Sequence, residues 1–265
     1  QRNFPLVGRF RGLAKSIRPM IHQYFVESDI DGRPFNKLER DIVYARANKG
    51  RDTTPFGTQK DVYQEGYEWM SHSIAAKDAH DIAIPKVKIG NHQCTQPYEA
   101  SLLNVSAMSF GSLSAAAIEA MNKGVEKADA YHNTGEGGLS PYHKQGGDVV
   151  FHFGTGYFGV RTKDGNFSME KMKVLAENNP CIRAIEIKLS QGAKPGKGGV
   201  LPGAKITKEI AEIRGVEVGK DVLSPATHKA FSSIPELLNL IESIAEETGL
   251  PVGIKAAIGK LDQWE

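Results

Sequence analysis

The sequence predicts a parallel α/β fold for the part of the chain that follows Ile82. Two observations predict it. Short apolar runs, typical of buried strands, are separated by longer segments whose apolar residues recur at helical spacing. The two kinds of segment also alternate along the chain instead of gathering into separate blocks. Such alternation is typical of a parallel sheet whose strands are connected by helices.

The segment before this region is polar and irregular, with short helical pieces. Residues 11–18 carry apolar side chains at helical spacing, and Pro19 is predicted to end that helix. Residues 35–44 form a second short amphipathic candidate. We predict that residues 1–80 form an N-terminal extension or cap packed on the main domain, residues 81–265. The charged side chains of this extension are expected on a solvated face.

In the main domain, the strands are expected in four apolar runs, residues 102–108, 148–153, 184–187 and 251–257. The helices are expected at residues 114–128, 168–178, 205–214 and 234–248. The first of these helices shows the pattern well. Ser114 is a suitable N-cap, and Ile118, Met121 and Val125 share one face.

The segment after the third expected strand is the most informative for function. It reads Lys188-Leu-Ser-Gln-Gly-Ala-Lys-Pro-Gly-Lys-Gly-Gly-Val-Leu-Pro202, with Lys188, Gln191 and Lys194 at steps of three. Two cations and an amide donor suit an anionic ligand, and the glycines let the backbone approach that ligand closely. The segment therefore predicts an anion-binding site at the end of this strand.

Three segments together resemble a known family. Residues 188–196 resemble the signature of the FMN-binding domain of glutamate synthases. Ser106-Ala-Met-Ser-Phe-Gly-Ser112 is similar to the end of that domain's first barrel strand, and Asn133-Thr-Gly-Glu-Gly-Gly138 is similar to its next glycine-rich loop. The resemblance covers residues 89–259, with the segments in the right order.

The resemblance implies a TIM-type (β/α)8 barrel, of which we expect only the N-terminal part here. It implies an FMN-dependent oxidoreductase that reductively aminates a 2-oxo acid, 2-oxoglutarate, to glutamate. Its partners would be ammonia, free or derived from glutamine, and an electron donor protein or a nicotinamide cofactor. Two earlier segments, residues 55–59 and 66–69, look like the stand-alone flavin-domain branch and not like the large glutaminase-fused enzymes.

The resemblance also implies roles for individual residues. Flavin contacts are implied for Ala107, Met108, Ser109, Asn133, Thr134 and Lys188. Substrate contacts are implied for Gln191, Lys194 and Arg214, and catalytic roles for Lys188 and Glu136. Lys188 would lie at the flavin's N1–O2 edge, and Glu136 would orient a lysine or an ammonia molecule. Without the resemblance, Glu136 is an exposed loop carboxylate and Arg214 a cation that complements a helix dipole.

Some features depart from the family pattern. Val200 stands where glutamate synthases have Gln, so one polar substrate contact is missing. No glycine-rich loop of the kind that holds the flavin phosphate follows Lys260, and the chain supplies no cysteines for an iron–sulfur cluster. Only 176 residues follow Ile89, whereas a barrel of this type has about 250. We therefore expect the natural protein to continue for at least ~100 residues.

Composition excludes several other classes. The formal net charge of +2 and the lack of a basic run with interleaved aromatic residues argue against nucleic-acid binding. Cys94 and Cys181 are the only cysteines, which indicates a reducing, cytoplasmic location without disulfides. No apolar run approaches the roughly 20 residues of a membrane span.

Two motifs fail on spacing or context. None of the eight histidines stands in a His-x-x-x-His or Glu-x-x-His pair, so we predict no metal site, and His132, His152 and His228 are expected to be ordinary hydrogen-bonding residues. Residues 154–159 match G-x-G-x-x-G, but a strand and turn are expected to follow instead of the helix that a dinucleotide site needs.

Two alternatives to the glutamate synthase interpretation stay open. In the first, the chain is an incomplete barrel that binds no flavin and has no activity. In the second, it is a flavin domain for another amine or oxo-acid reaction. Flavin absorbance bands separate the first of these alternatives from the other interpretations.

Overall fold

The computed structural model describes residues 4–51, 57–91, 94–193, 196, 198–260 and 262. The chain divides into two compact units, Gln1–Lys77 and Asp78–Glu265. Lys194, one of the residues predicted to bind substrate, lies outside the described residues.

The first unit contains α1 (Pro5–Ile21), a π-helical turn (His22–Val26) and α2 (Lys37–Ala47). The prediction that Pro19 ends the first helix is wrong, because α1 continues through this residue to Ile21. A proline inside a helix removes one backbone donor, but its fixed φ is helical. One lost hydrogen bond therefore weakens the last turn of α1 without ending it.

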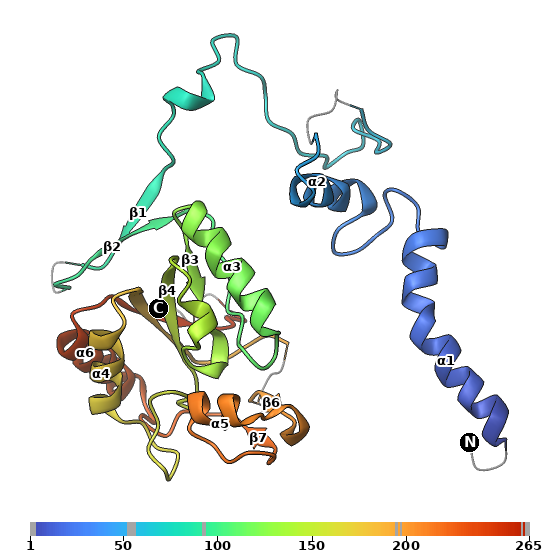
Figure 1. Cartoon of the computed structure of the whole chain (residues 1–265). Helices are drawn as coiled ribbons and strands as arrows, with labels where there is room; N and C mark the ends of the chain where they lie inside the picture. The colour runs from blue at the N-terminus through green and yellow to red at the C-terminus, as the bar shows by residue number, and fades with distance from the viewer. Residues whose placement is uncertain are drawn as a thin grey trace. The chain divides into compact units, whose positions relative to one another are not determined.

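The second unit begins with a pair of antiparallel strands, β1 (Lys86–Ile89) and β2 (Tyr98–Ser101), which the sequence patterns did not predict. The main sheet follows, with the strands β3 (Tyr131–Asn133), β4 (Asp148–Phe153), β5 (Ile182–Lys188) and β8 (Val252–Lys255). All neighbouring strands in it are parallel, and their order in the sheet is their order in the chain (Figure 1). This arrangement confirms the parallel α/β prediction and is consistent with part of a TIM-type barrel.

Four helices accompany these strands, α3 (Ala115–Lys127), α4 (Met169–Asn178), α5 (Lys208–Arg214) and α6 (Ile234–Thr248). Two short strands, β6 (Val200–Leu201) and β7 (Val222–Leu223), form an antiparallel pair; β6 precedes α5 in the chain and β7 follows it. Short 3₁₀ turns occupy Ala79–Asp81, Gly135–Gly137, Pro141–His143 and Gly203–Lys205. Each of the four helices has a Ser or Thr N-cap whose side chain accepts a backbone N–H, as Ser114 does from Ala117.

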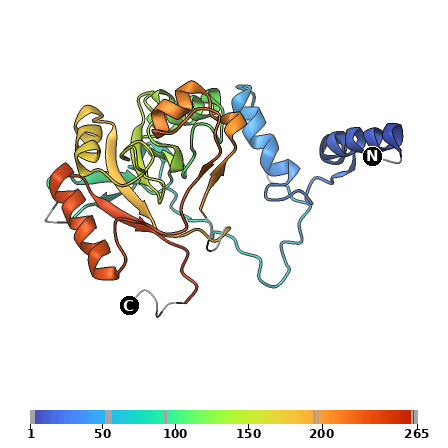
Figure 2. The same cartoon turned by 90° about the horizontal axis from the view of Figure 1, so that it is seen from below.

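Helix α4 and helix α6 lie side by side on one face of the sheet (Figures 1 and 2). Apolar side chains from alternate strand positions, such as Phe151, Ile185 and Ile187, are fully buried in the same cluster as Met172 and Ile244 of these helices. Since successive strand residues face opposite sides, the residues between them face the other side of the sheet. That side carries the polar residues described below.

The predicted strand at residues 102–108 is wrong for most of its length. Only Val105 makes a bridge, to His132, while Leu102 and Leu103 are 65% and 84% exposed. The Asn104 side chain accepts from the Tyr131 N–H and donates to the Ser101 carbonyl. Backbone hydrogen bonds also join the segment to β3, from the Val105 N–H to the Tyr131 carbonyl and from the Met108 N–H to the Asn133 carbonyl. The segment therefore runs beside β3 without forming a full strand.

His132 differs from the ordinary hydrogen-bonding residue that was expected. It is fully buried, and neither ring nitrogen has a partner among the described residues. Burial, with a small contribution from His143, lowers its pKa from 6.5 to about 4. Between these two values the unfolded chain binds a proton that the folded chain does not. With respect to His132, the free energy of unfolding is therefore highest above pH 6.5, and it decreases as the pH falls towards 4.

We expect His132→Leu to remove this pH dependence. The wild-type free energy of unfolding should fall relative to the variant by about 1.4 kcal/mol for each pH unit below 6.5. Urea denaturation at several pH values down to about 4.5 measures it. If the free energy of unfolding changed with pH in the same way for both proteins, the assignment of a buried, neutral ring would be contradicted.

Candidate functional site

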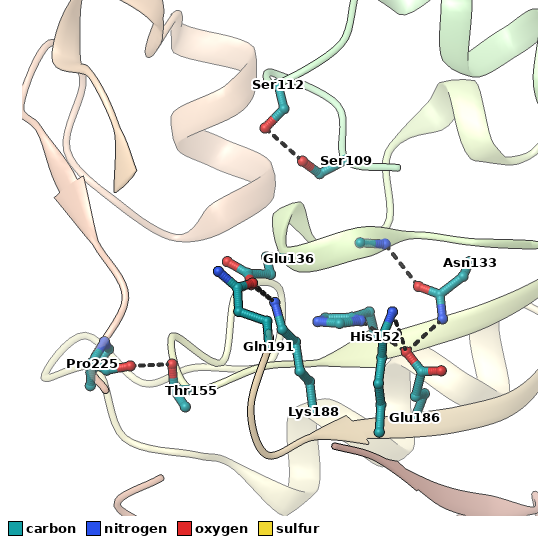
Figure 3. Close-up of polar contacts among 12 residues, drawn as sticks. Ser109, Ser112, Asn133, Glu136, His152, Thr155, Glu186, Lys188, Gln191 and Pro225 are labelled. Carbon is teal, nitrogen blue, oxygen red and sulfur yellow. Dashed lines mark hydrogen bonds and ion pairs between the residues drawn. The ribbon is translucent and has the colours of Figure 1, made fainter. Parts of the chain in front are cut away.

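The carboxyl ends of the parallel strands bring the predicted site residues together. Lys188 is the last residue of β5, and its ammonium group donates to the Glu136 carboxylate and to Gln191 Oε1 (Figure 3). Glu136 comes from the loop after β3, and Gln191 from the loop after β5. The Lys188 and Glu136 side chains are largely buried, at 15% and 27% exposed, so water screens this ion pair only in part.

These residues line a cavity of about 350 Å³. Its lining includes Ala107, Met108, Ser109, Glu136, His152, Phe158, Lys188, Gln191, Val200 and Arg214. The segments after Met108, Thr134 and Leu189 therefore meet at this cavity.

Glycine 135 allows the Glu136 loop to lie close to the segment that holds Ser109. Its φ is +64°, and an added Cβ would lie 2.8 Å from the Ser109 nitrogen and 3.0 Å from the Met108 carbonyl carbon. A side chain here would therefore separate the two segments that form opposite parts of the cavity. The Asn133 Oδ1 accepts from the Gly135 N–H at 3.0 Å and fixes the turn.

Arg214, the last residue of α5, is only 4% exposed. Its Nη2 donates to the Phe110 carbonyl at 3.1 Å, and its guanidinium lies over the Phe158 ring, 5.2 Å from the centroid. Burial lowers its pKa, while the nearby charge of Glu136 acts in the opposite direction. Arginine stays charged in proteins, and its Nε has no partner among the described residues. A buried cation with spare donor capacity therefore borders the cavity.

A second polar group crosses the sheet next to this cavity. Glu186 on β5 accepts from Asn133 Nδ2 at 2.9 Å and pairs with His152 Nδ1 at 3.2 Å and Lys255 Nζ at 3.8 Å (Figure 3). Burial alone would raise the pKa of Glu186. The hydrogen bonds from His152 and Asn133 and the charge of Lys255 outweigh it, so the pKa lies below its usual value. The carboxylate is therefore ionised at neutral pH.

His152 connects the two polar groups. Its Nδ1 pairs with Glu186, whereas its Nε2 is buried without a partner among the described residues, and the residue lines the cavity. A buried polar atom without a partner costs stability unless a ligand or water satisfies it. His152 is hydrogen-bonded as predicted, but the sequence interpretation did not assign its place in the cavity lining or its buried Nε2 without a partner among the described residues.

Two other buried histidines hold the backbone of the site. His143 Nε2 lies 3.0 Å from the Met108 carbonyl oxygen, and its Nδ1 lies 2.7 Å from Ser140 Oγ. His228 Nε2 lies 2.8 Å from the Lys188 carbonyl oxygen. Burial lowers the pKa of both rings. The neutral rings therefore fix the two backbone segments that carry Met108 and Lys188.

The remaining predicted residues lie next to the cavity or outside the described chain. Asn133 lines a neighbouring cavity of about 330 Å³, which shares Ala107 with the first. Thr134 is fully buried, and its hydroxyl accepts from the His152 N–H at 3.0 Å. The sequence interpretation missed Phe158, Glu186 and Lys255. Their signal was weak, although Glu186 lies between two isoleucines in β5 and Lys255 is the last residue of β8.

The glycine motif at residues 154–159 forms turns, and the helix that a dinucleotide site needs does not follow it, as predicted. The motif is followed by an isolated bridge between Arg161 and Phe167. Tyr157 in it is fully buried, and its hydroxyl accepts from the backbone N–H groups of Lys229 and Ala230. Among the described residues, no three His, Cys, Asp or Glu side chains gather closely enough to hold a metal ion.

Residues 51–262 match the sequence pattern of a family described as the conserved region in glutamate synthase. The chain belongs to the glutamate synthase family. Its relatives in this family include the glutamate synthase large subunit-like protein YerD of Bacillus subtilis, 34% identical over 97% of this chain and 56% of YerD. The archaeal-type glutamate synthase [NADPH] of Thermotoga maritima is 40% identical over 57% of this chain and 28% of that protein.

Another member of the glutamate synthase family, the archaeal glutamate synthase [NADPH] of Archaeoglobus fulgidus, is 35% identical over 69% of this chain and 32% of its own length. This chain thus spans about half of YerD and about a third or less of the archaeal and archaeal-type enzymes. The family match includes all the segments that form the 350 Å³ cavity.

Proposed function

We propose that this chain is the FMN- and substrate-binding part of an oxidoreductase that reductively aminates 2-oxoglutarate to glutamate. The observation that carries the proposal is the grouping of Lys188, Gln191 and Arg214 around one cavity that also contains Glu136. Ammonia, free or derived from glutamine, and an electron donor protein or nicotinamide cofactor are the proposed partners. We assign the role to residues 81–265 and treat residues 1–80 as an extension.

The described residues fit a flavin ring in three respects. The cavity volume of about 350 Å³ falls within the range of about 300–1,000 Å³ that is usual for ligand sites. Ala107 and Met108 give it an apolar wall, suited to a flat aromatic ring. His152 Nε2 and Arg214 Nε are buried polar atoms without partners in the described part of the chain. When bound, FMN supplies the hydride that reduces the imine formed from the 2-oxo acid and ammonia.

The charges around the cavity favour a dianionic oxo acid. Lys188 and Arg214 contribute two positive charges and Glu136 one negative charge, so the described lining has a net charge of +1. The guanidinium of Arg214 is proposed to bind a substrate carboxylate in a bidentate way. Its contact with the Phe110 carbonyl holds it in place before the substrate arrives.

Lys188 and Glu136 are proposed to act as a pair. The ion pair holds the ammonium group of Lys188 at the end of β5, where it stabilises negative charge that develops on the flavin and the substrate. Glu136 has a second carboxylate oxygen, which is suited to bind an ammonia molecule. Asn133 and Thr134 are proposed to position these residues, because Asn133 fixes the Gly135 turn and Thr134 fixes the β4 backbone at His152.

The proposal is tested by adding FMN to the purified protein and following the flavin bands. We expect a bound flavin whose reduced form is reoxidised when 2-oxoglutarate and ammonium are both present, with one glutamate formed per flavin. Oxaloacetate and pyruvate serve as oxo-acid controls, because both keep the reacting group. Oxaloacetate shortens the chain by one carbon and keeps both carboxylates, whereas pyruvate lacks the distal carboxylate.

The outcomes distinguish the alternatives. Faster reoxidation with another oxo acid would support a different substrate, because Val200 in the cavity lining has no amide for the distal carboxylate. Flavin binding without any oxo-acid dependence would contradict the proposed reaction. No flavin binding would support the interpretation as an inactive, incomplete barrel.

A further inference from the structure

Helix α1 presents a continuous apolar face that is exposed. The described side chains on this face are Val7, Phe10, Leu13, Ile17 and Ile21, with exposed fractions of 70%, 70%, 58%, 38% and 47%. At 3.6 residues per turn, these positions fall within one arc of the helix surface of about 120°. Isolated exposed apolar residues are common, but an exposed face of this extent marks an interaction surface.

The polar face of the same helix carries only positive charge. Arg9, Arg11, Lys15 and Arg18 lie on it, and the first 26 residues of the chain contain no Asp or Glu. By helical geometry, Arg9 lies at one edge of the apolar arc, while Arg11 and Arg18 lie at the other. Basic residues on both edges of an apolar face are the pattern of a helix lying in the surface of an anionic membrane.

We propose that α1 binds the surface of a lipid bilayer that contains anionic lipids. The apolar side chains would enter the boundary between head groups and acyl chains, and the arginines at the edges would contact lipid phosphates. The long stems of these arginines lie along apolar surface while their charged ends reach the head groups. A neutral protein groove would explain the apolar face, but it gives no reason for basic residues on both edges.

Charge complementarity also sets the expected size of the effect. Each basic residue near an anionic membrane surface strengthens binding by about fivefold. The loss of Arg9 and Arg18 is therefore expected to weaken binding about 30-fold. The loss of the Phe10 ring from the apolar face is expected to weaken it by at least about tenfold.

The test is cosedimentation of the 265-residue chain with sucrose-loaded vesicles. The probes are vesicles of phosphatidylcholine mixed with phosphatidylglycerol, and vesicles of phosphatidylcholine alone. We expect binding to the anionic vesicles, weaker binding at high salt, and little binding to the neutral ones. Arg9→Gln with Arg18→Gln, and separately Phe10→Ser, should reduce binding by the factors above.

Matched controls lie in the same unit. Lys60→Gln with Lys77→Gln removes two charges from exposed positions outside α1, and Val43→Asp changes an exposed apolar residue of α2. These variants should bind vesicles like the wild type, except for a small effect of net charge. The vesicle assay needs no flavin, so its outcome is independent of the proposed reaction.

Three outcomes would overturn the proposal. The first is equal binding to both kinds of vesicle, and the second is no loss of binding in the arginine variant. The third is no vesicle binding in the wild type. In that case, a lower melting temperature of Phe10→Ser would show that the face packs within the chain, and dissociation of a dimer would show self-association.

Discussion

Replacing Lys188 by Met is expected to lower the rate of 2-oxoglutarate-dependent flavin reoxidation about 100- to 1000-fold. Removal of one preorganised electrostatic contact typically costs about 2.7–4 kcal/mol in the transition state. The side chain length and the apolar stem are nearly kept, so packing around the end of β5 should change little. The substitution removes the positive charge that Glu136 and Gln191 hold in place.

The measurement is single-turnover reoxidation of the reduced flavin, with flavin content and circular dichroism recorded for each preparation. Lys173→Met is the matched control, because this lysine forms an ion pair of 2.9 Å with Glu247 on the outer surface of α4 and α6. Removing that exposed pair should cost at most about 1 kcal/mol of stability and leave the rate unchanged. A wild-type rate in Lys188→Met, with normal flavin content, would remove this lysine from the mechanism.

Arg214→Lys is expected to raise the KM for 2-oxoglutarate about 10- to 100-fold and to change kcat less. Lysine keeps the charge, but it loses the planar fork that binds a carboxylate through two hydrogen bonds. Each hydrogen bond to a charged group contributes about 1.5–3 kcal/mol. The lysine also cannot keep both the Phe110 carbonyl contact and the stacking on Phe158 that hold Arg214 in the wild type.

Arg183→Lys provides the matched control for this variant. Arg183 also lies over an aromatic ring, Tyr98, at 5.4 Å, but its side chain is 44% exposed and lies outside the cavity. KM should be unchanged in the control. If Arg214→Lys instead lowers the melting temperature with a wild-type KM, Arg214 acts only in packing, and the proposed carboxylate contact is wrong.

Local signals in the sequence were enough to predict several elements. The span of α6 was predicted correctly as residues 234–248. In the structure, Ser233 caps its start and Gly249, with a φ of +71°, ends it. Residues 148–153 form β4 as predicted, since the run is apolar and bounded by polar or glycine residues. Such elements depend little on distant contacts.

Other parts depended on contacts that no local pattern contains. The Asn104 side chain, within the expected strand, accepts from the Tyr131 N–H, which lies 27 positions away. His152 was expected to be an ordinary hydrogen-bonding residue, and only the tertiary structure shows that it lines the cavity with a buried Nε2 that has no partner among the described residues. The family motifs around Lys188 and Glu136 indicated the site, whereas the row of Glu186 contacts beneath it required the register of four strands.

That row has a consequence for how the sheet assembles. Asn133, His152, Glu186 and Lys255 come from four different strands. The contacts of the Glu186 carboxylate with the other three residues form only when each strand is in its native alignment. Sliding β5 by one residue would turn Glu186 into the apolar layer under α4 and α6, where an unpaired charge is strongly destabilising. The Glu186 carboxylate therefore favours the native strand register, because a misaligned sheet would bury this charge without its partners.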